Sequence, residues 1–181
     1  MVVHLVANQS TRVRFPLPAP QFFVLLQGKT MELNASHSFH QILPWLAFSK
    51  PADQWLESMR GQTIEAQLES RRITKVCVEE MISTAAIGIG KDNNLTVYFN
   101  YYGTSLQDCI ESLGHEIGHT FHYDLSKTPP IKITDDDRDE KLLYIIEDFC
   151  NLFSLKWIMV NDKKEIERCC KKAGVRFHNN S

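Results

Sequence analysis

The chain lacks a long apolar run, a strong charge of either sign and any CxxC pair. Its densest apolar run, residues 22–26, contains five residues, whereas a membrane-spanning helix needs about 20. The net charge is -2 at pH 7 and basic runs are short, so the composition gives no reason to expect a nucleic-acid-binding surface. We therefore expect neither membrane insertion nor direct nucleic-acid binding.

Cysteine is present in a pattern that disfavours a disulfide framework. The five cysteines are an odd number and are scattered along the chain: Cys77, Cys109, Cys150, Cys169 and Cys170. Secreted domains with disulfide frameworks usually carry an even number at close spacings. We therefore expect reduced thiols and a cytoplasmic location.

The length of 181 residues suits one domain with a proper core. Residues 8–20 carry three prolines in five positions and show no helical or strand period. They resemble the 3′ end of a transfer RNA gene read as protein, which predicts that translation begins at Met31. We expect residues 1–30 to be disordered or wrongly included in the chain, and residues 31–181 to form a single domain.

The first half of this domain predicts short helices followed by a small sheet. Residues 36–60 are rich in Trp, Leu and Phe but contain two prolines, which predicts two short helices or a helix and a turn. Residues 62–70 continue with a helical period. Residues 73–78 and 95–102 alternate or are rich in β-branched and aromatic residues, as strands are, and residues 85–90 predict a further short strand.

The second half is helical. From Ser105, a plausible N-cap with Asp108 in the first turn, apolar residues recur at helical spacing through Phe121. A second helix is predicted from Thr134 to about residue 160, and a third amphipathic segment ends at Gly174. The order of elements predicts an α+β fold with a small mixed or antiparallel sheet packed against helices.

The segment LGHEIGHTFHYDL, residues 113–125, contains the clearest chemistry of the chain. His115 and His119 are one helical turn apart on the same face, so both imidazoles can reach one metal ion. Glu116 is turned about 100° from His115, which places its carboxylate beside the metal rather than on it. This HExxH pattern on a helix is typical of zinc peptidases. We predict two metal ligands, with Glu116 as the catalytic base.

Two glycines flank these histidines. Gly114 and Gly118 each cost about 1 kcal/mol against alanine in a helix interior. A close approach of another backbone or of a substrate would explain them. We expect such a contact on this helix.

A catalytic zinc site of this kind needs a third protein ligand. His122 stays near the face of the first two histidines. In metzincin-like peptidases the ligand would stand at the position of Leu125, which excludes that class. A ligand from a later helix would be Glu140, Glu147 or Asp148, and spacing alone leaves these three open.

The segment EDFCNLFS, residues 147–154, follows the histidine motif, and the two together resemble the ImmA/IrrE family of bacterial metallopeptidases. In that family HExxH is followed by a helix of the form E-x-x-A-N-x-F-A. Glu147, Asn151 and Phe153 match this form. The resemblance spans about residues 70–160.

The chain also departs from the family pattern. Cys150 and Ser154 stand where the family has alanine. The segment before the first histidine is Ser112-Leu-Gly, and the usual ending of the glutamate helix is replaced by Leu155-Lys-Trp-Ile-Met. These departures concern the edges of a substrate cleft more than the metal site.

The resemblance implies a zincin-like site in which Zn²⁺ is bound by His115, His119 and Glu147. Glu116 would activate the metal-bound water, and Asn151 would steady a ligand. The implied activity is that of a zinc metallo-endopeptidase. Its implied partner is a protein substrate, a helix-turn-helix transcriptional repressor.

Other questions stay open at this point. His122, Tyr123 and Tyr144 are candidates for stabilising the oxyanion, and the alternative for the two tyrosines is simple packing beside the site. A non-catalytic zinc-containing module that binds a repressor or toxin is the alternative function, and a peptidase of different biology, such as a self-regulated toxin, is another. The intact Glu116 argues against the non-catalytic module, because a purely structural zinc site has no use for a base.

Overall fold

The structure, a computed structural model, describes residues 39–100, 105–133 and 140–175, except for the side chains of 39–47 and 140–141. The elements of the first half are α1 (Phe39–Ser58), α2 (Ile64–Ser70), β1 (Ile73–Glu79), β2 (Ala85–Ile89) and β3 (Leu95–Asn100). Those of the second half are α3 (Leu106–His119), the 3₁₀ turn η1 (Thr120–His122), β4 (Tyr123–Asp124), β5 (Ile131–Lys132), α4 (Glu140–Val160) and α5 (Lys163–Lys172). Over the described residues the fold is therefore α+β, as predicted.

The three predicted strands are present and form one sheet in the order β1-β3-β2. β1 pairs with β3 in parallel and β2 pairs with β3 antiparallel, so the sheet is mixed. The central strand is the most buried, since Leu95, Val97 and Phe99 are fully enclosed. A second, two-stranded sheet joins β4 to β5.

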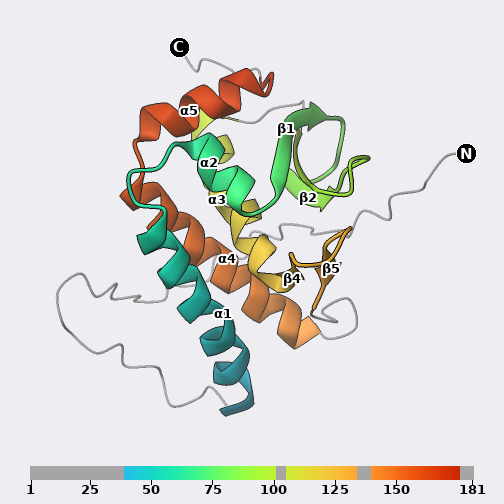
Figure 1. The fold of residues 1–181 in the computed structure, drawn as a ribbon, viewed down its shortest axis with the longest axis vertical. Coiled ribbons are helices and arrows are strands. Elements are labelled where there is room, and N and C mark those ends of the chain that lie inside the picture. The colour runs from blue at the N-terminus through green and yellow to red at the C-terminus, as the bar shows by residue number, and fades with distance from the viewer. Residues whose placement is uncertain (1–38, 101–104, 134–139, 176–181) are drawn as a thin grey trace, which may run out of the picture.

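Helix α3 begins where the sequence predicts. Ser105 and Asp108 form a capping box, in which the Ser105 hydroxyl accepts from the Asp108 backbone N–H and the Asp108 carboxylate accepts from the Ser105 backbone N–H. The apolar stripe of Ile110, Leu113 and Ile117 is fully buried. α3 contacts both α4 and the sheet (Figure 1).

Helix α4 crosses the middle of the molecule in Figure 1, with α1 and α3 packed against it. The predicted start of this helix, Thr134, lies outside the described residues, and Glu140 is its first described residue. None of the described helices combines the length and apolar character that crossing a membrane requires.

The prediction for residues 36–60 was wrong. Instead of two short helices or a helix and a turn, one continuous helix, α1, passes through Pro44 and Pro51. A proline in a helix interior costs about 3 kcal/mol. The buried residues Ala52 and Leu56 belong to the core that α1 forms with α4, and this packing outweighs the local cost.

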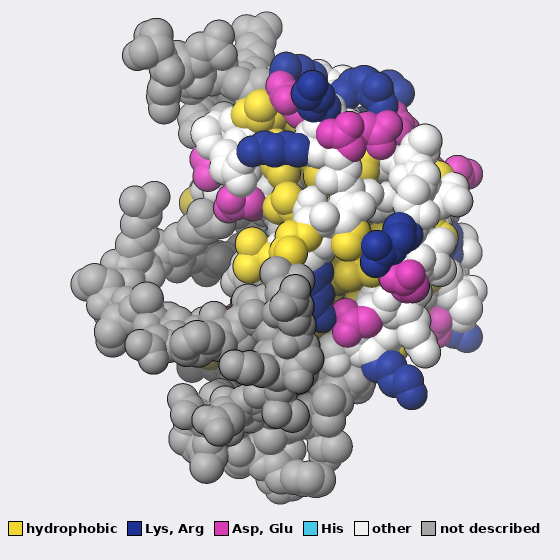
Figure 2. Space-filling view, turned by 90° about the vertical axis from the view of Figure 1, so that its left-hand side faces the viewer, with side chains coloured by type: hydrophobic (Ala, Val, Ile, Leu, Met, Phe, Trp, Pro, Cys, Tyr) yellow, Lys and Arg dark blue, Asp and Glu magenta, His cyan; other side chains and the backbone are white. Residues whose placement is uncertain are grey.

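The last helix, α5, lies at the top of Figure 1 and is amphipathic. Ile166 and Cys170 face the core, while the ion pairs Glu165–Arg168 and Glu167–Lys171 lie on the outer side. Figure 2 shows Lys, Arg, Asp and Glu side chains interspersed along the upper edge, at the height of this helix. The predicted third helix is confirmed, and Gly174 follows it with a φ of +91°.

Candidate metal centre

The two motif histidines meet at their Nε2 atoms. These atoms of His115 and His119 are 3.0 Å apart, and the ring centroids are 4.7 Å apart. Both side chains project from the last two turns of α3, as the spacing of four predicts. Two nitrogen lone pairs are thereby directed at one point.

Glu147 reaches the same point from α4. Its Oε2 lies 3.2 Å from Nε2 of His115, and its Oε1 lies 3.5 Å from Nε2 of His119. In a tetrahedral zinc site with metal–ligand bonds of 2.0–2.2 Å, ligand atoms are about 3.4 Å apart. The three side chains therefore have the chemistry and the spacing of a zinc ligand set.

Asn151, one turn after Glu147, contacts His115 from behind. Nδ1 of His115 donates to the side-chain oxygen Oδ1 of Asn151 over 3.0 Å. Since the proton of a neutral imidazole is then on Nδ1, the Nε2 lone pair is left for a cation. The structure places Asn151 where the sequence predicts, and it acts on His115.

The motif glycines explain why α4 comes so close to α3. A Cβ added at Gly118 would lie 3.1 Å from the Cα of Cys150. A Cβ at Gly114 would lie 2.7 Å from Oγ and 3.0 Å from Cα of Ser154. The predicted close approach of a backbone is confirmed, and that backbone is α4.

The partners of these glycines on α4 are themselves small. Cys150 and Ser154 occupy successive turns, and Ser154 donates through Oγ to the backbone oxygen of Glu111 over 2.6 Å. Gly114 and Gly118 on one helix thus face Ser154 and Cys150 on the other, in opposite chain directions. This contact brings Glu147 to the histidines.

Cys150 also belongs to the metal-binding geometry. One ligand atom each from His115, His119 and Cys150 lie within 4.8 Å of one another. The thiol is buried and forms no disulfide. From the sequence, Cys150 is predicted only to replace an alanine of the family pattern, and its position beside the histidines is not. Its place three residues after Glu147, on the same helix face, was the available signal.

The charges in the cluster favour a cation between the ligands. Burial opposes a charged His115, but the hydrogen bond and charge of Glu147, with the charge of Glu116, raise the pKa of His115 above its ordinary value. Burial likewise opposes a charged Glu147, yet the hydrogen bond from His115 and the charges of both histidines lower its pKa. A metal ion can take the place of the proton that these shifts favour.

The other two groups of the motif are shifted mainly by burial. Burial, with the charge of His115, lowers the pKa of His119 to about 3, so this ring is a neutral ligand. Glu116 is 5% exposed, and its burial raises its pKa to about 7, with His115 acting to lower it and Glu147 to raise it further. A carboxyl group with such a pKa can accept and return a proton near neutral pH.

The remaining candidate site residues lie in different surroundings from one another. His122 is buried between Phe48 and Phe149, with ring centroids 4.0 and 5.4 Å away, and its ring centroid lies 6.4 Å from that of His119. It thus lies in an aromatic core rather than at an open rim of the site.

The two tyrosine candidates differ in exposure. Tyr123 is half-buried and packs against the core, whereas Tyr144 is 70% exposed on α4. Of the alternative third ligands, Asp148 is exposed, and the side chain of Glu140 lies outside the described residues. Of the three acidic candidates, Glu147 is the one with described contacts to both histidines.

One supporting residue was missed entirely. Arg71 donates to Oγ1 and to the backbone oxygen of Thr120, over 2.7 and 2.9 Å, and its guanidinium lies 4.0 Å from the ring centre of Phe121. Desolvation lowers the pKa of Arg71 to about 10. It holds the end of α3, next to His119, against α2. No local pattern in the sequence signals a pairing across that distance.

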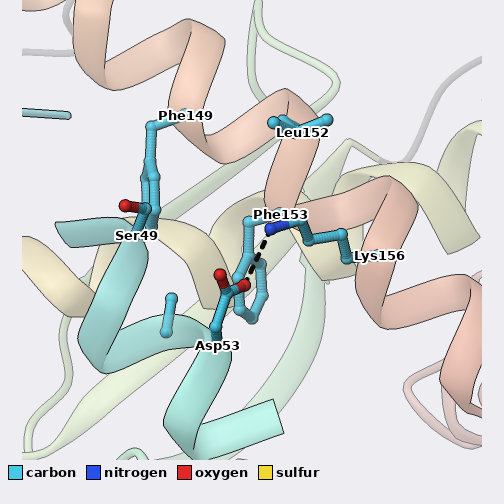
Figure 3. A pocket seen from close by; sticks show the side chains of 7 residues that line it. Ser49, Asp53, Phe149, Leu152, Phe153 and Lys156 are labelled. Carbon is cyan, nitrogen blue, oxygen red and sulfur yellow. Dashed lines mark hydrogen bonds and ion pairs between the residues drawn. The ribbon is translucent and has the colours of Figure 1, made fainter. Parts of the chain in front are cut away.

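Two hollows lie away from these ligands. The smaller, of about 10 Å³, lies between α1 and α4 and is closed by an ion pair of 2.7 Å between Asp53 and Lys156 (Figure 3). The larger, of about 470 Å³, is bounded by α2, β1 and α5. Neither is lined by His115, His119 or Glu147.

No model of a known protein family matches the chain, and no curated protein or solved structure matches it either.

Proposed function

We propose that the chain is a zinc-dependent metallo-endopeptidase with His115, His119 and Glu147 as metal ligands and Glu116 as general base. The observation that carries the proposal is the convergence of the three ligand side chains, whose facing atoms are 3.0, 3.2 and 3.5 Å apart. Three protein ligands of this type leave one position of a tetrahedral zinc ion for water.

The chemistry follows from the residues around that position. A bound zinc ion would lower the pKa of a coordinated water toward 7 and polarise a peptide carbonyl. Glu116 takes the proton of the attacking water and passes it to the departing amine, a role that its pKa of about 7 suits. Asn151 holds His115 in the tautomer that binds metal.

The proposed substrate is a protein, namely a helix-turn-helix transcriptional repressor. The support is the resemblance of HExxH and of residues 147–154 to the ImmA/IrrE family. A zincin-like arrangement is part of the same proposal, in which a histidine helix and a following glutamate helix pack together. This step rests on family analogy.

The test is the substitution Glu116→Gln, measured as zinc content and as cleavage of purified helix-turn-helix repressors, including any encoded beside this gene. Zinc retained with cleavage reduced by about a thousandfold or more is expected, because the base is lost and the ligands are kept. Glu111→Gln, at an exposed position of the same helix, is the matched control and should cleave normally. Undiminished cleavage by Glu116→Gln would overturn the mechanism.

A non-catalytic, zinc-containing binding module is the second candidate. The observation in its favour is Cys150, which offers a fourth protein ligand atom beside the two histidines. Structural zinc sites have four protein ligands and no open position. If the wild-type protein binds zinc and the repressor but leaves it uncut, this candidate replaces the first.

A further inference from the structure

Cys150 has two independent structural relations to the metal centre. Its sulfur forms one compact group with ligand atoms of His115 and His119, all within 4.8 Å of one another. Its backbone also lies against Gly118, where an added Cβ would be 3.1 Å from Cα and 3.2 Å from Sγ of Cys150. The thiol is therefore held beside the ligands by a contact that leaves no room for a larger neighbour.

The position of Cys150 on α4 makes coordination geometrically accessible. Glu147 and Cys150 are three residues apart and share a helix face, so both side chains can be directed at His115 and His119. In a tetrahedral site with Zn–S of about 2.3 Å and Zn–N of about 2.0 Å, sulfur and nitrogen are about 3.5 Å apart. The sulfur of Cys150 lies within 4.8 Å of a ligand atom of each histidine, and coordination would shorten this distance to that separation.

We infer that Cys150 is a further metal ligand, whose thiolate competes with water for the position that hydrolysis requires. The inference rests on the proposed metal site and concerns its regulation. Binding of the thiol to the metal releases its proton to solvent. The resting site then has two nitrogens, one carboxylate and one sulfur, a donor set that favours zinc and other thiophilic ions over Mg²⁺ or Mn²⁺.

The experiment replaces zinc by Co²⁺ and records the absorption spectrum. The wild-type complex is expected to show visible d–d bands and a strong near-ultraviolet band from charge transfer between sulfur and cobalt. Cys150→Ser should keep the d–d bands and lose the charge-transfer band, with cobalt affinity reduced by about tenfold or more. Cys109→Ser, a buried thiol elsewhere on α3, is the matched control and should keep the band.

The outcomes separate this inference from the proposed function. Absence of d–d bands in wild type would mean that no such metal site exists and would overturn both. Presence of d–d bands without charge transfer in wild type, or a band that persists in Cys150→Ser, would overturn the role of Cys150 alone. Cys150→Ala is the second variant, since its small side chain also fits against Gly118, and circular dichroism confirms that each variant is folded.

Discussion

The α3–α4 contact has a polar cluster at each end, and the two clusters differ in whether their hydrogen bonds are complete. Near Gly114, Trp157 donates through Nε1 to Oε1 of Gln67 over 2.6 Å. Gln67 donates in turn to Asn161 Oδ1 over 2.6 Å, and Asn161 donates to the backbone oxygen of Trp157 over 2.8 Å. Each donor meets an acceptor, so this end is complete without any added group.

At the other end, the hydrogen bonds are complete only with an added proton or cation. Because Nδ1 of His115 donates to Asn151, its Nε2 can donate to the Glu147 carboxylate only when the ring is protonated, and Glu147 favours that form. A metal ion between the two Nε2 atoms and the Glu147 carboxylate would take the place of that proton. Two polar clusters on one helix pair can therefore serve different purposes. One stabilises the fold, and the other provides a site for a positive charge.

The largest expected effect is the loss of zinc affinity when a proposed metal ligand is removed. His119→Ala is expected to lower zinc affinity on the order of a thousandfold, because structural zinc binding is worth about 10–16 kcal/mol and is shared among few ligands. Metal-free unfolding should change much less, since the lost ring is neutral and 20% exposed. A chelator competition titration measures the first quantity, and thermal unfolding in excess chelator measures the second. A metal-free variant that is unfolded would show that His119 is needed for the fold, and would contradict this distinction between the two clusters.

The matching change at the complete end should act on stability alone. Trp157→Phe is expected to lower the free energy of unfolding by about 3 kcal/mol, through a smaller core side chain and a lost buried hydrogen bond. Zinc affinity should be unchanged. Trp55→Phe, which removes a bond of 2.9 Å to Ser70 nearer the surface, is the control, with an expected loss of about 1 kcal/mol. Denaturant titrations of both variants measure these losses. A weakened zinc affinity in Trp157→Phe would contradict the expectation that this cluster affects stability alone.

A smaller effect is expected from the residue that orients His115. Asn151→Ala should lower zinc affinity by about 10- to 100-fold with little change in stability, because the side chain of Asn151 is exposed and its contact is to a ligand. Asn151→Asp keeps an acceptor oxygen and should retain the affinity. Calorimetric zinc titration measures both. Equal affinities of the alanine variant and wild type would remove Asn151 from the site.

The smallest expected effects on stability are those of the two glycines, and their zinc affinities distinguish the two clusters most directly. Gly114→Ala and Gly118→Ala should each lower the free energy of unfolding by about 1 kcal/mol, since overpacking exceeds the gain in helix propensity. Gly118→Ala should also weaken zinc binding, because its Cβ displaces the Cys150 backbone near the ligands. Gly114→Ala should leave zinc binding intact. Identical zinc affinities of the two variants would show that α4 moves as one rigid body.

Local patterns in the sequence predicted what local interactions decide. The start of α3 at Ser105, its apolar stripe and the placement of His115 and His119 on one helix face all follow from helical spacing and capping. The three strands follow from β-branched and aromatic runs, and the two glycines of α3 predicted a close contact with a backbone or a substrate. Each of these depends on residues within a few turns of one another.

What failed or stayed open depends on tertiary contacts. The continuity of α1 through Pro44 and Pro51 is decided by packing on α4, which local propensity does not contain. The third ligand was selected by family resemblance, and spacing left three acidic residues open. The contact of Arg71 with Thr120 joins residues far apart in the chain. The place of Cys150 beside the histidines was equally unseen, because it requires the relative position of α3 and α4.

The glycine contact between α3 and α4 has a consequence for the kinetics of the site. The separation of the α3 and α4 backbones beside the proposed ligands is set by close contacts at two glycines, which have no side-chain torsion to rotate. Side-chain rotation therefore changes this backbone separation little, and the entropy of bringing the two helices together is lost on folding rather than on metal binding. Metal binding should therefore require little movement of α3 relative to α4. Its rate should depend on dehydration of the ion rather than on rearrangement of these helices.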